Sequence, residues 1–202
     1  MSTKTYHALT KSPQAGAPLI FAFHGTGGDE HQFFDLAQQL CPKAGVVSPR
    51  GDVSEIGAAR FFRRTAEGVY DMDDLARRTE AMAAFVASHK ARNPDAPVYG
   101  FGYSNGANIL ASVAMAHPDL FARIGLLHPL IPWQPQATPA LAGKRILITA
   151  GKRDPICPWP LSQNLIDWFA AQGAEVSTHI HDGGHELRQP EVAALQTLLT
   201  AP

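Results

Sequence analysis

Residues 98–110, which read VYGFGYSNGANIL, decide the fold. An apolar strand pattern over 98–102 passes almost without a loop into a helical pattern over 105–116, and the junction from Gly102 to Gly106 matches G-x-S-x-G. A nucleophilic serine must stand clear of a sheet on such a turn, where flanking glycines let strand and helix approach without side-chain clashes. The motif predicts Ser104 as a nucleophile, and the alternative is an ordinary glycine-rich strand–helix turn.

Strands and helices alternate on both sides of this junction. Apolar runs predict strands at 19–23, 46–47, 98–102, 124–127, 145–150 and 176–180, with an antiparallel edge strand at 6–9. Helical spacing predicts helices at 29–40, 73–90, 105–116, 160–172 and 191–200. This order predicts an α/β fold, a mainly parallel central sheet with helices on both faces. Residues 49–70 show no period, and the proline-rich stretch 129–139 is expected to be irregular.

Composition narrows the class of protein without naming an activity. The 202 residues suit one domain over 1–202, and 45% hydrophobic with 17% charged residues is typical of a globular protein. A net charge of -1 gives no electrostatic case for binding nucleic acid. No apolar run approaches the ~20 residues that a membrane span needs. Two cysteines and a start without an apolar signal-peptide core predict a cytoplasmic protein with reduced thiols.

A serine nucleophile needs a base, and the base needs an orienting acid. In α/β-hydrolases these residues follow the serine in the order acid, then histidine. Asp154 follows the strand 145–150 after a short glycine-containing turn, and His185 follows the strand 176–180 in a Gly-Gly loop. Both therefore fall at the carboxyl ends of parallel strands, where open α/β sheets place their sites. The alternatives are a turn-forming Asp154 before proline and an exposed loop histidine.

Other histidines offer rival interpretations. His181 is the rival base, although no Gly-Gly pair precedes it. His179, His181 and His185 have near-alternating spacing, but no carboxylate or cysteine set is seen to complete a zinc geometry, so no metal is expected. His24 is expected to shape the glycine turn behind it, and His128 reads as the end of an element.

The run from Gly25 to Gly28 after the first buried strand is expected to form part of an oxyanion hole. The predicted donors are the backbone N–H groups of Thr26 and Asn105. A phosphate-binding loop is the alternative, but the run lacks the lysine of G-x-x-x-x-G-K-[ST] and does not fit G-x-G-x-x-G. No nucleotide or other cofactor is therefore expected.

Four blocks of sequence resemble the phospholipase/carboxylesterase family of α/β-hydrolases, which includes acyl-protein thioesterase-like enzymes. They are HGTGGDE at 24–30, GYSNGAN at 102–108, GKRDPI at 151–156 and GGHE at 183–186, and the resemblance covers about residues 17–200. It implies the α/β-hydrolase fold, a triad of Ser104, Asp154 and His185, and oxyanion donors at Thr26 and Asn105. Tyr-Ser-Asn-Gly in place of the commoner Phe-Ser-Gln-Gly is similar to a bacterial subgroup of predicted carboxylesterases. Family members are often dimers, so the resemblance suggests a homodimer.

The expected function is hydrolysis of small to medium carboxylic esters through an acyl-enzyme on Ser104. No long insertion supplies a large lid, so a minimal lid or none and a shallow pocket are expected. The alternatives with the same triad are a thioesterase or lysophospholipase and a lactone hydrolase. A further alternative is a relative of the fold that binds a small molecule without turning it over.

Candidate pocket walls are the large apolar side chains that precede or follow the motifs, each of which could equally pack in the core. They are Phe62, Leu130, Trp133 and Ile156, with Ile131 and Trp159 as further candidates. Arg60, Arg63 and Arg64 could bind an acidic group of the substrate, but ion pairs with Glu55, Glu67 or Asp71 are favoured. Cys157, close to Asp154, is expected to be within reach of thiol reagents.

Overall fold

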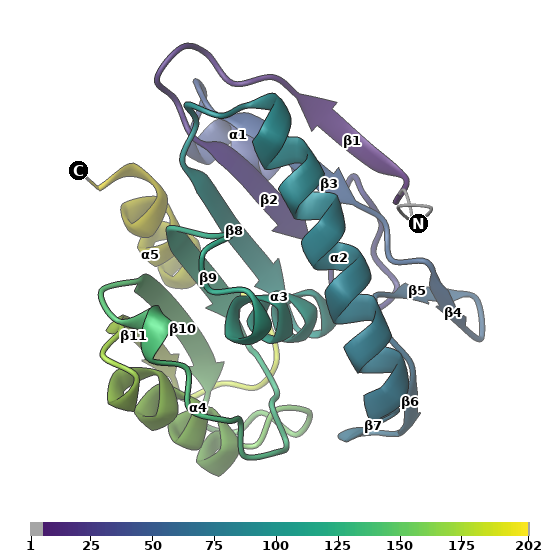
Figure 1. Cartoon of the computed structure of the whole chain (residues 1–202). Coiled ribbons are helices and arrows are strands. Elements are labelled where there is room, and N and C mark those ends of the chain that lie inside the picture. The colour runs from purple at the N-terminus through teal and green to yellow at the C-terminus, as the bar shows by residue number, and fades with distance from the viewer. Residues whose placement is uncertain (1–5, 202) are drawn as a thin grey trace.

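A computed structural model describes residues 6–201, which fold around a seven-stranded sheet (Figure 1). In spatial order its strands are β1 (Ala8–Lys11), β3 (Gly45–Pro49), β2 (Leu19–Phe23), β8 (Val98–Tyr103), β9 (Arg123–Leu127), β10 (Arg145–Gly151) and β11 (Glu175–His181). β1 pairs antiparallel with β3, and all other neighbours pair parallel. The predicted mainly parallel sheet is confirmed, and its antiparallel edge strand begins two residues later than predicted.

Helices cover both faces of the sheet, as predicted (Figure 1). On one face lie α2 (Met72–Arg92), α3 (Asn105–Ala116) and α4 (Trp159–Ala171), and on the other lie α1 (Phe34–Leu40) and α5 (Gln189–Thr200). Strand β2 shows why both faces need cover. Its side chains alternate between the two cores, with Phe21 and Phe23 toward α2 and α3 and with Ile20 and Ala22 toward α1, and all are fully buried.

Two segments differ from the sequence prediction. The helix expected at 29–40 begins at Phe34, because the Asp29 carboxylate accepts the His31 N–H at 2.9 Å and forms a separate turn. The stretch 49–70 is not a plain loop. It holds two hairpins, one formed by β4 (Val53–Glu55) and β5 (Ala58–Arg60), the other by β6 (Arg64–Ala66) and β7 (Val69–Tyr70). Strands of two or three residues are too short to show a period.

The irregular stretch after β9 is confirmed and contains a short 3-10 helix, η1 (Pro139–Leu141). Within the described part of the chain, none of the helices combines the length and apolar character that crossing a bilayer requires.

The β8–α3 turn brings three backbones into close contact. Ser104 has φ 52° and ψ -118°, a conformation that side chains rarely adopt, and its N–H donates to the Leu127 carbonyl at 2.9 Å. A Cβ on Gly102 would lie 2.5 Å from the Gly106 carbonyl oxygen. A Cβ on Gly106 would overlap the carbonyl oxygens of Phe23 and His24. Only glycine therefore lets α3 start directly against β2 and β8.

We expect Gly106→Ala to lower the free energy of unfolding by about 3 kcal/mol, because β2 and α3 must move apart. Gly143→Ala is the matched control, since Gly143 has φ 72° with no atom near its missing Cβ, and its cost should be about 1–2 kcal/mol. Urea unfolding measures both. A loss in Gly106→Ala no larger than that of the control would contradict the close contact.

Candidate active site

Ser104, His185 and Asp154 meet at the carboxyl ends of three parallel strands, where sites of open α/β sheets lie. Ser104 is the single residue between β8 and α3, Asp154 follows β10, and His185 lies in the loop after β11. Ser104 Oγ lies 2.9 Å from His185 Nε2, and His185 Nδ1 lies 2.7 Å from Asp154 Oδ2. The structure therefore brings the three residues into one continuous hydrogen-bonded arrangement.

The surroundings of Asp154 keep its carboxylate ionised. Burial raises the pKa of Asp154, but hydrogen bonds outweigh it and hold this pKa below its usual value. Asp154 Oδ1 accepts the N–H groups of Ile156 at 2.8 Å and Cys157 at 2.9 Å, and Oδ2 accepts from His185. An ionised Asp154 places the proton of a neutral His185 on Nδ1, so that Nε2 can accept a proton from Ser104.

The loop that carries His185 is fixed by Tyr103, the residue before Ser104. Its hydroxyl donates to the His185 carbonyl at 2.6 Å, and the two ring centroids lie 5.2 Å apart. His181, the rival base, is engaged elsewhere. Its Nδ1 accepts the Gly183 N–H at 2.9 Å, and its Nε2 lies 3.3 Å from Glu191. His185 is thus the histidine that faces Ser104.

The turn after β2 carries Thr26, whose backbone N–H is one of the two predicted oxyanion donors. Gly27 N–H donates to the Ala59 carbonyl at 3.0 Å, which fixes the turn. Within residues 6–201, neither the Thr26 nor the Asn105 N–H has a hydrogen-bond acceptor, and Asn105 is the first residue of α3. The buried His24 contacts the glycine turn behind it, since its Nδ1 lies 2.6 Å from the Gly25 carbonyl oxygen, and its Nε2 accepts the Gly51 N–H at 2.8 Å.

A cavity of about 300 Å³ lies beside Ser104. Of the six candidate walls, Leu130 and Ile156 line it, and the further candidates Ile131 and Trp159 do not. The prediction is wrong for Phe62 and Trp133, because the side chain of Tyr70 lines the cavity instead and both rings pack against it, with centroids 4.8 Å and 6.1 Å away. Phe62 is fully buried in the core, as the alternative had it.

Part of the cavity wall is polar, and it is formed by Arg60, Arg64, Glu67, Tyr70 and Asn108. Arg60 and Arg64 were among the arginines offered as ligands of an acidic substrate group, whereas sequence reasoning missed the other three as wall residues. Asn108 Nδ2 donates to the Tyr70 hydroxyl at 2.8 Å, and the hydroxyl donates to the Leu130 carbonyl at 2.9 Å. The Leu130 N–H donates to Asn108 Oδ1 at 2.6 Å. The one signal in the sequence was the position of Asn108, one helical turn after Ser104.

Ion pairs fix the arginine-rich hairpins, as the favoured prediction had it. Arg60 lies 3.4 Å and Arg64 lies 2.9 Å from Glu55, and Arg63 lies 3.2 Å from Asp71. Arg60 is almost fully buried, and its Nη1 also donates to Thr26 Oγ1 at 2.8 Å.

Cys157 lines the cavity beside Ser104, as the prediction of access requires, but its surroundings do not favour reaction with thiol reagents. The side chain is buried, and burial raises the pKa of the thiol. Its Sγ donates to the His128 carbonyl at 3.3 Å. A buried thiol that resists ionisation reacts slowly.

His128 was expected only to end an element, but it is fully buried beside Asp154, with Nδ1 3.1 Å from Asp154 Oδ2. Of the three histidines weighed as a metal set, His181 has a carboxylate neighbour that the sequence analysis did not name. Glu191, from α5, lies with His128 and His181 so that their ligand atoms are all within 4.8 Å of one another. His179 and His185 are not part of this group. The Nε2–Oε1 contact of 2.8 Å between His128 and Glu191 occupies two of these atoms.

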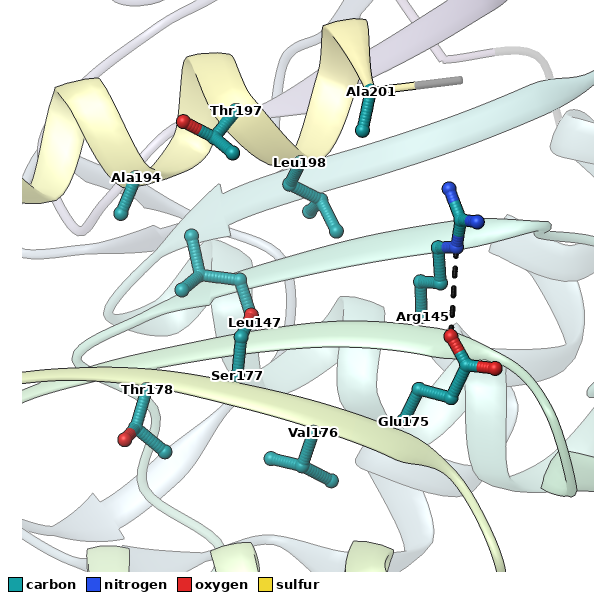
Figure 2. A pocket seen from close by; sticks show the side chains of 10 residues that line it. All are labelled: Arg145, Leu147, Glu175, Val176, Ser177, Thr178, Ala194, Thr197, Leu198 and Ala201. Atoms are coloured by element: carbon teal, nitrogen blue, oxygen red, sulfur yellow. Dashed lines mark ion pairs between the residues drawn. The ribbon is translucent and has the colours of Figure 1, made fainter.

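A larger cavity, of about 660 Å³, lies between the last strands and α5 (Figure 2). Its wall is mostly apolar, with Leu147, Val176 and Leu198, and an ion pair of 3.5 Å joins Arg145 to Glu175 at one end. It includes no residue of the Ser104 arrangement. The smaller cavity is therefore the candidate substrate site, because it contains Ser104 and His185 and the larger one does not.

Comparison with known proteins identifies the family of the chain. The model of the family described as "Putative esterase" matches residues 4–197. The chain belongs to this esterase family. It is a hydrolase with the α/β-hydrolase fold.

Three relatives of the esterase show how far the likeness extends. The "Putative hydrolase MhqD" of Bacillus subtilis is 38% identical over 175 residues, which cover 86% of this chain and 88% of the relative. A carboxylesterase structure from Bacillus cereus is 35% identical with a TM-score of 0.88, covering 95% of this chain and 92% of that one. The structure of the protein Atu2452 of unknown function from Agrobacterium tumefaciens is 51% identical with a TM-score of 0.91, covering 97% and 96%.

The lowered pKa of Asp154 in this esterase predicts a pH-dependent stability. Unfolding returns the pKa of the carboxyl to about 3.9, so the ionised group stabilises the fold above that pH. This contribution is lost as the pH falls through the folded-state pKa. We expect the free energy of unfolding to fall more steeply below about pH 4 in the wild type than in Asp154→Asn.

Urea unfolding between pH 7 and pH 3 measures these slopes. Asp167→Asn is the matched control, because Asp167 lies exposed on α4, and its slope should follow that of the wild type. Parallel slopes in the wild type and Asp154→Asn would contradict the prediction.

Proposed function

We propose that this chain is a serine carboxylesterase that hydrolyses small to medium carboxylic esters through an acyl-enzyme on Ser104. The observation that carries the proposal is the continuous arrangement of Ser104 Oγ, the His185 ring and the Asp154 carboxylate, with contacts of 2.9 Å and 2.7 Å. Nucleophile, base and orienter each have the partner that the chemistry requires.

In the first half-reaction, Ser104 Oγ attacks the ester carbonyl carbon while His185 Nε2 takes the hydroxyl proton. Asp154 stabilises the imidazolium that forms. The new oxyanion accepts from the Thr26 and Asn105 N–H groups, which have no other acceptor within residues 6–201. One such donor stabilises the transition state by about 3–4 kcal/mol. The α3 N-terminus adds positive potential at the same place.

Collapse of the tetrahedral intermediate breaks the ester C–O bond, and His185 gives its proton to the leaving alcohol. In the second half-reaction, water takes the place of the alcohol. His185 accepts a proton from this water as its oxygen attacks the acyl carbon, and the same two N–H groups hold the oxyanion. The acid leaves and the proton returns to Ser104 Oγ. The steps use only side chains, backbone and water.

The cavity supports small to medium substrates. Its volume of about 300 Å³ lies at the lower end of ligand pockets, which run from about 300 to 1,000 Å³. Leu130 and Ile156 offer apolar contact, whereas Arg60, Tyr70 and Asn108 make part of the wall polar. A long acyl chain would need a continuous apolar channel. A cytoplasmic location and assembly as a homodimer stay predictions.

We expect Ser104→Ala to lower turnover of p-nitrophenyl acetate by roughly 10⁴-fold or more, because the nucleophile is lost. A fluorophosphonate should add one adduct to the wild type and none to this variant, as read by intact mass. Wild-type turnover of the acetate should exceed that of the octanoate, since the cavity is small.

Ser112→Ala is the matched control, because Ser112 is a buried serine of the same helix outside the cavity, and it should keep both adduct and turnover. A folded wild type with neither adduct nor turnover would contradict the proposal and favour a binding protein on the same fold.

A further inference from the structure

Asp154 has a second histidine partner that the reaction described above does not use. Its Oδ2, which receives His185 at 2.7 Å, also lies 3.1 Å from Nδ1 of His128. The other ring nitrogen of His128, Nε2, lies 2.8 Å from Oε1 of Glu191. The side chains of Asp154, His128 and Glu191 are fully buried. A chain of contacts thus runs from Glu191 through His128, Asp154 and His185 to Ser104.

The number of protons available for these hydrogen bonds restricts the charge of His128. Both of its ring nitrogens face carboxylate oxygens, but a neutral imidazole has only one N–H. Asp154 also accepts two backbone N–H groups, and Glu191 Oε2 accepts the Arg188 N–H at 2.7 Å. Either His128 carries both protons as an imidazolium, or Glu191 is protonated and donates to it.

The surroundings favour the imidazolium. Burial lowers the pKa of His128, but its bonds to Glu191 and Asp154 outweigh burial and raise this pKa. Burial raises the pKa of Glu191, but its bond with His128 and the Arg188 N–H hold this pKa below the usual value. Glu191 also lies in the first turn of α5, where the helix dipole favours an anion.

The groups that face His128 come from every element packed around it. They are Asp154 after β10, Glu191 on α5, and the rings of Tyr103, His181 and His185 at 5.9, 5.4 and 5.3 Å between centroids. Only the two carboxylates are anions at neutral pH. The protonated ring lies between them, so each buried negative charge has a positive neighbour.

The backbone of His128 is held in a strained conformation. Its φ of 49° is one of three positive values at non-glycine residues within 6–201. One of the others belongs to Ser104, and the third to Ile56 in a hairpin turn. The His128 N–H donates to the Thr149 carbonyl at 3.0 Å, and its carbonyl accepts from Cys157. Such strain persists where surrounding contacts fix it, and it is concentrated at functional sites.

We propose that His128 is a positioning residue for the Ser104 reaction: an imidazolium, held by Glu191, that fixes the Asp154 carboxylate in the orientation that His185 requires. The proposal rests on the proposed function. Without His128, Asp154 Oδ2 would lose one of the two donors that direct it, and His185 would be held less well for proton transfer. Glu191 acts one step further away, by keeping the proton on His128.

Two variants remove the charge of His128 and leave a neutral N–H donor toward Asp154, so they test whether the charge-assisted bond is what fixes the carboxylate. His128→Asn places an amide N–H near the Nδ1 position, so it can keep the bond to Asp154, and asparagine tolerates positive φ. Its uncharged amide cannot replace the imidazolium. Glu191→Gln offers an N–H to His128 Nε2, as a protonated Glu191 would, and it removes the anion that holds the second proton.

The exposed pair of His117 and Glu80, 3.0 Å apart, provides the matched controls His117→Asn and Glu80→Gln.

The measurement is kcat and KM for p-nitrophenyl acetate, per active site titrated to completion with a fluorophosphonate. We expect kcat to fall about 10- to 100-fold in both variants with KM nearly unchanged, as for other partners that act through a reacting group. A loss of folded protein alone would lower the number of titrated sites and leave kcat per site intact. The two controls should match the wild type.

The pH profile supplies a readout that a structural role would not move. His128→Asn removes a positive charge whose ring lies 5.3 Å from that of His185 but leaves Glu191 anionic, so the acid limb of kcat/KM should move to higher pH. Glu191→Gln removes one negative and one positive charge, so its acid limb should move less. Equal profiles in His128→Asn and the wild type would contradict the charge on His128.

¹⁵N NMR of histidine-labelled wild type tests the proton directly, with His128→Asn to assign the signal. We expect both ring nitrogens of His128 to be protonated at pH 7, and one to lose its proton in Glu191→Gln. An unprotonated nitrogen at pH 7 in the wild type, or an unchanged kcat per site in Glu191→Gln, would overturn the proposal. A wild type that takes no fluorophosphonate adduct would instead overturn the proposed function, while the NMR result would still stand.

Discussion

The close contact of three backbones at the β8–α3 turn is the constraint on which the site depends. Gly106 lies against the carbonyl oxygens that end β2, and Gly102 lies against the first turn of α3. Since no side chain separates them, the helix begins at once after the strand, and Ser104 is forced to φ 52°. The same contact sets the end of β2, which leads into the turn that carries Thr26. Ser104 and the two N–H groups proposed as oxyanion donors, those of Thr26 and Asn105, therefore belong to residues that border one cavity.

Buried charge is the second constraint. Asp154 and Glu191 are carboxylates without solvent contact, and an isolated buried carboxylate would be protonated rather than ionised. Each carboxylate accepts at least one hydrogen bond from a backbone N–H group, and the His128 ring lies between the two carboxylates. An apolar replacement of the whole set could pack as well, because a buried ion pair is weak evidence for stability. The proposed role of this buried set is therefore its effect on His185 rather than a contribution to stability.

The sequence predicted the parts of the site that local patterns encode. Strand, glycine turn and helix around Ser104 follow from residues 98–116, and Asp154 and His185 follow from their position after strands. The contacts of His128 with Asp154 and Glu191 join residues 26 and 63 positions apart, so no local pattern contains them.

The prediction of the pocket walls was wrong in part for a related reason. Which face of a hairpin or proline-rich segment points to the cavity depends on packing, and the ring of Tyr70 occupies the position expected for Phe62 or Trp133. The late start of the helix at Phe34 reflects a side-chain bond of Asp29 that competes with helical capping.

Chemistry and selectivity have different structural supports in this esterase. The reacting groups lie on the ends of sheet strands, which are fixed by the two cores, whereas Arg60, Arg64, Glu67 and Tyr70 reach the cavity from the hairpins of 53–70. Those hairpins are joined to the site through the buried Arg60, which contacts both Glu55 and the Thr26 hydroxyl. A change of hairpin sequence can therefore alter the cavity wall while Ser104, His185 and Asp154 keep their geometry, provided that Arg60 keeps its contact with the Thr26 hydroxyl.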